Sequence, residues 1–202
     1  MGTNRLESFS DGVMAVAITL LVLGIDVPGP SPDHTLGHEL LRQWPAYAAY
    51  VVSFMTIGII WINHHAMISR LASADHPILI LNLVLLMSIG VLPFATELMA
   101  TYLRHADGQE LAAALYSGAF LVMSLAFSTL NRHVLLRKSH LLSGSLPLAR
   151  RQAILSRALV GLIPYAVATA LAFVSAYATL AICAAVAVYY ALPVASGSPS
   201  AT

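Results

Sequence analysis

The chain has 202 residues, of which 58% are hydrophobic and only 9% are charged, whereas a soluble domain carries about a quarter charged residues. So few charges cannot cover a water-facing surface, which excludes a soluble globular protein. The formal net charge of +1 gives no general attraction to nucleic acid, so nucleic acid is not an expected partner. The apolar residues fall in runs of about 17 to 20, the length with which a helix crosses about 30 Å of hydrocarbon. We therefore expect an integral membrane protein.

The runs predict an all-α protein with six transmembrane helices in a single domain, residues 1–195, followed by a disordered tail, residues 196–202. The predicted spans cover about residues 9–26, 44–62, 78–96, 111–130, 158–174 and 176–194. The longest polar connection, residues 132–157, is interpreted as a cytoplasmic loop. The lone Cys183 lies in an apolar run, where we expect it to pack as a small hydrophobic residue.

The first span is not interpreted as a cleaved signal peptide, because it ends in a proline- and glycine-rich stretch without a small-x-small cleavage pattern. Only 14 uncharged residues separate Asp11 from Asp26, too few to cross a bilayer comfortably. Ser10 and Asp11 must therefore be drawn into the protein, where an ionisable group needs a partner. Arg5 and Asp11 lie about 120° apart around a helix, so each should reach another helix.

A separate face of the first span is aliphatic and carries one hydroxyl. Val16, Thr19, Leu20 and Leu23 fall within an arc of about 100° whose centre is well over 100° from Asp11. Any packed membrane helix can show such a stripe, and Thr19 can simply bond back to a carbonyl one turn earlier. The pattern alone leaves both interpretations open.

Later boundaries follow from local signals. Asp75 is a predicted N-cap for the third span, with Pro77 in its first turn. Pro93 and Pro164 lie inside spans and are expected to kink them. The uncharged stretch from residue 158 to residue 194 is too long for one crossing, and we divide it at a hairpin formed by Ser175-Ala176-Tyr177.

Histidines are the main candidates for other chemistry. His64 and His65 are adjacent and point to different faces of a helix, so a structural hydrogen-bonding role is favoured over a shared metal site. His34 and His38, flanked by Asp33 and Glu39, have a spacing that would suit zinc if this segment were helical. A solvated loop is favoured there, and no metal or cofactor is expected.

The distribution of basic residues predicts that both termini are cytoplasmic. Eight of the ten Lys and Arg residues share the side of the N-terminus: Arg5, Arg70, Arg132, Arg137, Lys138, Arg150, Arg151 and Arg157. The other side carries only Arg42 and Arg104. The basic segment from residue 137 to residue 151 either attracts anionic lipid or only enforces this topology.

The first span resembles a known family. Arg5, Phe9, Ser10 and Asp11 form the pattern Arg-x-x-x-Phe-Ser-Asp, which continues as Gly-Val-x-Ala-x-Ala-Ile-Thr-Leu-Leu-Val-Leu. This resembles the signature first helix of the transmembrane protein 175 family, in its short prokaryotic form, whose members are potassium-permeable channels. The similarity is close over residues 5–28 and extends more weakly to residues 61–65.

The resemblance implies a homotetramer in which the first helix of each subunit lines a central pore. By position, Val16 and Leu23 would form aliphatic constrictions, with Leu20 on the same face and Thr19 as a hydroxyl ring between them. The family usually has isoleucine or leucine where this chain has Val16. A polar network behind the pore would hold the first helix, and its members would be Arg5, Phe9, Ser10, Asp11, Trp61, Asn63 and His64, with His65 and Asn82 as further candidates.

We therefore expect a potassium-permeable cation channel of the cell membrane, not an enzyme, with potassium and other monovalent cations and the lipid bilayer as its partners. No Thr-Val-Gly-Tyr-Gly filter loop is present, so selectivity must arise from side chains of the first helix and should be modest. The alternative is a secondary transporter of a small solute or cation. A transporter would normally show internal repeats, and spans one to three share no visible pattern with spans four to six.

Overall fold

The computed structural model describes residues 2–30, 34–105 and 107–192, and these residues form helices and connections. The helices are α1 (Thr3–Leu20, extended by a 3-10 turn, Leu21–Gly24), α2 (Leu36–Arg42), α3 (Trp44–Ile68), α4 (His76–Gly90), α5 (Leu92–Tyr102), α6 (Gln109–Arg132, continued by a π-helical turn, His133–Arg137), α7 (Leu148–Val160), α8 (Leu162–Leu171) and α9 (Ala176–Ala191), with a short 3-10 turn at Ser139–Leu141. Within these ranges the only β pairing is one isolated bridge, Leu71 with Leu142. The all-α prediction is confirmed.

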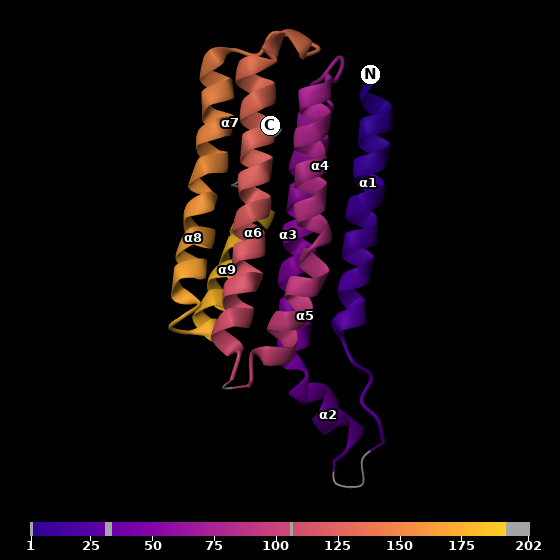
Figure 1. Ribbon diagram of the computed structural model, residues 1–202, viewed down its shortest axis with the longest axis vertical. Coiled ribbons are helices and arrows are strands. Elements are labelled where there is room, and N and C mark those ends of the chain that lie inside the picture. Colours follow the sequence, from indigo (N-terminus) through magenta and orange to yellow (C-terminus); the bar gives the residue numbers. More distant parts are fainter. Residues whose placement is uncertain (1, 31–33, 106, 193–202) are drawn as a thin grey trace, which may run out of the picture.

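The long helices run side by side, with α1 at one edge of the bundle, α7 and α8 at the other, and α2 at the end opposite the N-terminus (Figure 1). Five described segments are long and apolar enough to cross a membrane: Thr3–Gly24, Trp44–Ile68, His76–Tyr102, Gln109–Arg137 and Leu148–Leu171. The sixth apolar helix, Ala176–Ala191, is shorter. The spans are thus six in order. The first begins six residues before its expected limit, the second ends six residues after its limit, and the third and fourth extend beyond theirs at both ends.

Both internal prolines coincide with a break in their span. The third span is divided into α4 and α5 at Val91, just before Pro93, and the fifth into α7 and α8 at Gly161, just before Pro164. A proline removes one backbone hydrogen bond and crowds the carbonyl four residues earlier. At Gly161 a Cβ atom would lie 2.5 Å from the Tyr190 hydroxyl oxygen, so any larger residue there would force the Tyr190 ring to move.

The expected cap at Asp75 is present, and Ser175, in the expected hairpin, forms a second cap. The Asp75 carboxylate accepts a hydrogen bond from the Ile78 N–H (3.2 Å) and opens α4. The Ser175 hydroxyl accepts one from the Ala178 N–H (3.2 Å) and opens α9. Asp75 also forms an ion pair with Lys138 (2.7 Å), and the hydrogen bond from Lys138 lowers the pKa of this carboxyl below its ordinary value.

Two segments interpreted as loops are helical. Of the expected loop at residues 132–157, only residues 138–147 form a connection; the rest is the end of α6 with its π-helical turn and most of α7. The first turns of α7 are polar and basic, so the apolar run that predicted the fifth span begins only near the end of this helix. Residues 36–42, expected to be a solvated loop, form α2, and the Thr35 side chain caps it by accepting from the His38 N–H (3.4 Å). The predicted tail, 196–202, and the last two residues of the predicted sixth span lie outside the described residues.

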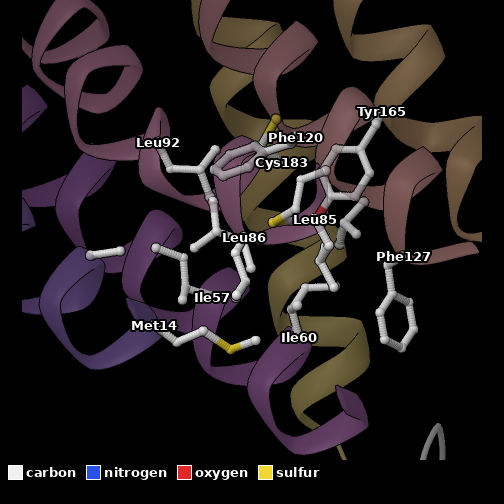
Figure 2. Packing of buried hydrophobic residues seen from close by; sticks show 14 of the residues in the cluster. Met14, Ile57, Ile60, Leu85, Leu86, Leu92, Phe120, Phe127, Tyr165 and Cys183 are labelled. Atoms are coloured by element: carbon white, nitrogen blue, oxygen red, sulfur yellow. The ribbon is translucent and has the colours of Figure 1, made fainter. Parts of the chain in front are cut away.

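The core draws side chains from nearly every long helix. Figure 2 shows Met14 of α1, Ile57 of α3, Leu85 of α4, Leu92 of α5, Phe120 of α6, Tyr165 of α8 and Cys183 of α9 within one cluster. Aromatic edges add to this packing, with Tyr116 and Phe120 at a ring-centroid distance of 4.7 Å. Lipid tails are as apolar as these side chains, so close packing and interhelical hydrogen bonds hold the bundle together. Cys183 is buried and free, as expected.

Candidate functional site

Helix α1 has one face buried in its own subunit. Leu6, Ser10, Met14, Ala17 and Leu21 are buried at intervals of three or four residues, the spacing of one helical face. This face packs against α3 and α4. The sequence of α1 therefore fixes how the helix is rotated relative to the bundle.

The opposite side of α1 is uncovered in the subunit. Val16 is 57% exposed, Leu20 44% and Leu23 73%, and Thr19 lies exposed between them. These four side chains, which we call the open stripe, share one side of the helix. Three large aliphatic side chains on an uncovered helix at the edge of the bundle (Figure 1) indicate a surface completed by lipid or by another subunit.

The Thr19 hydroxyl donates a hydrogen bond to the Val16 carbonyl oxygen (2.9 Å), the local bond that the sequence left open. This bond uses the hydroxyl hydrogen. The lone pairs of the oxygen remain free to accept, which is the property needed to replace a water molecule around a cation.

A chain of hydrogen bonds ties the buried face of α1 to α3 and α4. The His64 ring Nε2 lies 2.7 Å from Asn82 Oδ1, and Asn82 Nδ2 donates to the Ser10 hydroxyl (2.9 Å). Ser10 in turn donates to the Leu6 carbonyl oxygen (2.8 Å). Because Asn82 Oδ1 can only accept, His64 must carry its proton on Nε2. His64, Asn82 and Ser10 are all fully buried, so each bond excludes solvent.

A second set of contacts between α1 and α3 lies at the surface, beside the buried hydrogen bonds. The Trp61 indole N–H donates to Asp11 Oδ1 (2.9 Å), and Glu7 Oε1 lies 2.6 Å from His65 Nδ1 in an ion pair when the imidazole is protonated. Glu7 and Asp11 are four residues apart on α1, and Trp61 and His65 are four apart on α3. The two helices run antiparallel (Figure 1), so Glu7 pairs with His65 and Asp11 pairs with Trp61 one helical turn further along.

The structure thus brings Ser10, Asp11, Trp61 and His64 together and leaves the other expected network members apart. Asn63 Nδ2 donates back to the Ile59 carbonyl of its own helix (2.8 Å). Phe9 is 54% exposed. Arg5 is exposed and, among the described residues of the subunit, has no hydrogen bond or ion pair.

Sequence reasoning gave too little weight to one member of this region and missed another. Asn82 forms hydrogen bonds with both Ser10 and His64, although it was only a further candidate in the sequence analysis. Glu7 was missed, and its signal was available: it precedes Asp11 by one helical turn, opposite the Trp61 and His65 pair.

One group of possible metal ligands exists among the described residues, and none of its members belongs to α1. The side chains of His34, His38 and Glu39 have ligand atoms that all lie within 4.8 Å of one another. They belong to α2 and the residue before its cap.

Comparisons with known proteins agree over nearly the whole chain. A family model described as "Endosomal/lysosomal potassium channel TMEM175" matches residues 5–93. A protein of Streptomyces collinus, named as a potassium channel, is 44% identical over 188 residues, which cover 93% of this chain and 91% of that protein. A protein of Chamaesiphon minutus, also named as a potassium channel, is 40% identical over 192 residues and 94% of each chain.

A solved structure extends the likeness to three dimensions. The crystal structure described as a lysosomal potassium-selective channel TMEM175 homolog from Chamaesiphon minutus superposes with a TM-score of 0.82 at 38% sequence identity. The match covers 94% of this chain and 96% of that chain. The arrangement of helices described above is therefore shared with a solved membrane channel.

Proposed function

The chain belongs to the TMEM175 family, and from that premise we propose that four identical subunits surround a central pore lined by α1. The protein is a potassium channel in a membrane and not an enzyme. The proposal concerns how it conducts: which helix meets the ions, which side chains restrict the path, and how the helix is held.

The open stripe of α1 is the observation that carries this proposal. Leu23 is 73% exposed and Val16 is 57% exposed, while the other face of the same helix is anchored by buried hydrogen bonds. A helix that is fixed on one side and uncovered on the other can present its free side to a symmetry axis. Around such an axis each side chain of the stripe becomes a ring of four.

These rings account for conduction without any charge in the pore. Rings of Val16 and Leu23 close the path by excluding water when narrow and permit ions when wider. Between them, the Thr19 oxygens replace part of the hydration shell of a potassium ion. Hydroxyl oxygens on flexible side chains form a less rigid site than a ring of backbone carbonyls, so the preference for potassium over sodium is modest.

The polar contacts behind the stripe hold α1 at a fixed rotation. Ser10, Asn82 and His64 supply the buried part, and Asp11 with Trp61 supplies the surface part. Asp11 faces α3 and is absent from the open stripe. Arg5 has no partner in the described part of its own subunit, and in the tetramer its guanidinium reaches the neighbouring subunit.

The basic residues orient the channel in the cell membrane with both termini in the cytoplasm. The N-terminus and the connections from α3 to α4 and from α6 to α7 lie at one end of the bundle (Figure 1), and this end carries eight of the ten Lys and Arg residues. Helix α2 then lies at the outer end.

Single-channel recording from purified protein in liposomes, with potassium on one side and sodium on the other, tests this function. We expect unitary current steps that reverse at a voltage displaced toward the potassium equilibrium potential. Transport that saturates at carrier rates without unitary steps would contradict a pore, because a carrier must rearrange for each substrate.

A further inference from the structure

Three side chains of types that can bind metal ions meet at the short helix α2, at the end of the bundle opposite the N-terminus (Figure 1). His34 precedes the Thr35 cap of α2, and His38 and Glu39 lie in its first turn. We propose that His34, His38 and Glu39 bind a first-row transition metal ion such as Zn²⁺. The proposal does not depend on the pore lined by α1, because none of these residues belongs to that helix.

The geometry places the three ligands near binding distance. The His34 and His38 ring centroids are 4.6 Å apart at an interplanar angle of 35°, and His38 Nδ1 lies 3.8 Å from Glu39 Oε1. Ligands around a tetrahedral zinc ion lie about 3.3 Å from one another, as follows from bond lengths of about 2.0 Å. The His38 side chain is half-exposed, so it has room to rotate toward the other two ligands.

The local fold creates this juxtaposition. The Thr35 side chain accepts a hydrogen bond from the His38 N–H (3.4 Å). This cap starts the helix at Leu36 and directs His34 back over the first turn. His34 therefore lies against His38, four residues later, and Glu39 is the next residue after His38. Among the described residues, the two imidazoles have no partner besides the contact with Glu39 and each other.

The donor set selects the class of ion. Two imidazole nitrogens and one carboxylate suit zinc and its neighbours in the transition series, whereas magnesium and calcium prefer oxygen ligands alone. Three protein ligands leave at least one position for water. The exposure of His38 and the open position make this an exchangeable site for an ion from the surrounding solution.

The Arg42 guanidinium competes with a bound metal ion for the Glu39 carboxylate. Its Nη1 lies 3.6 Å from Glu39 Oε1, so the guanidinium and a bound cation share one carboxylate. Removing this charge should therefore tighten metal binding. The backbone carbonyl of Arg42 separately accepts from Arg104 Nη1 (3.0 Å), and Arg42→Gln leaves that carbonyl in place.

Metal titration of the purified full chain, without a histidine tag and in detergent micelles, tests the proposal. Co²⁺ reports the site by its visible absorption, and Zn²⁺ is measured by displacing it. We expect one ion per subunit. His38→Ala should weaken binding by at least about tenfold, since loss of an outer-shell partner alone weakens it by about 10- to 100-fold. Arg42→Gln should tighten binding about two- to fivefold, the range of an exposed charge pair.

His140→Ala is the matched control, because His140 is an exposed histidine at the other end of the bundle; its metal affinity should equal that of the unmodified chain. Unchanged affinity in His38→Ala would overturn the proposal by locating the ion elsewhere, as would weaker binding in Arg42→Gln. The measurement involves no current, so its failure would leave the conduction proposal untouched.

Discussion

Substitution of Asn82 by alanine probes how α1 is held. The Asn82 side chain is the middle of the buried chain: its oxygen lies 2.7 Å from His64 Nε2, and its nitrogen donates to the Ser10 hydroxyl at 2.9 Å. Alanine removes both bonds at once. It leaves the His64 N–H without an acceptor inside the bundle, and α1 loses its buried hydrogen bond to α4.

The expected loss follows from the two bonds. Side-chain hydrogen bonds inside membrane proteins contribute about 0.6 kcal/mol on average and up to about 1.7 kcal/mol. Two such bonds correspond to about 1 to 3 kcal/mol of unfolding free energy. Asn63→Ala is the control, because the Asn63 amide is exposed and bonds only to its own helix. Its effect should stay within about 0.5 kcal/mol.

The assay is unfolding by sodium dodecyl sulfate in mixed micelles, followed by the fluorescence of the two tryptophans and carried out at one fixed protein concentration. A double-mutant cycle with Ser10→Ala should give a coupling of about 0.6 kcal/mol or more to Asn82→Ala. Equal stability of Asn82→Ala and Asn63→Ala, or a coupling of zero, would refute the reasoning.

Four further substitutions have definite outcomes. Thr19→Ala should lower the preference for potassium over sodium, and an unchanged bi-ionic reversal potential would count against the threonine ring. Leu23→Ala should raise the current at fixed voltage by widening the outer constriction; an unaltered current would move the gate elsewhere. Asp11→Ala should reduce the tetramer fraction in size-exclusion chromatography and leave selectivity intact, whereas a fully assembled variant with altered selectivity would contradict this role. Ser175→Ala removes the cap that accepts from the Ala178 N–H and should lower the unfolding free energy by about 1 kcal/mol; no change on chemical unfolding would show that the cap is dispensable.

Much of the fold could be predicted because membrane helices are marked by apolar length and by strong local signals. Pro93 and Pro164 located the two breaks, and Asp75 and Ser175 located two helix starts. Helix α7 escaped because its first turns are polar and basic, and because only one face, at Arg151, Ile154, Leu155 and Ala158, is partly buried. Its apolar residues do recur at helical spacing, but its low overall hydropathy hid it from a search for apolar runs.

The candidate site could be predicted only in part. A helical wheel gives the direction in which each side chain points, but it does not identify the residue on another helix that the side chain contacts. The wheel separated Asp11 from the open stripe, but nothing local indicated that Asn82, over seventy residues away, would join Ser10 to His64. Such a contact is decided by which helices are neighbours.

The accessibility of single cysteines along α1 during conduction tests the central claim most directly. The native Cys183 is buried and gives little background to a charged thiol reagent. The claim predicts that modification of Val16→Cys, Thr19→Cys and Leu23→Cys reduces potassium current, while Met14→Cys and Ala17→Cys, on the buried face, do not respond. Block at the buried-face positions, or none at the open stripe, would contradict a pore lined by this helix.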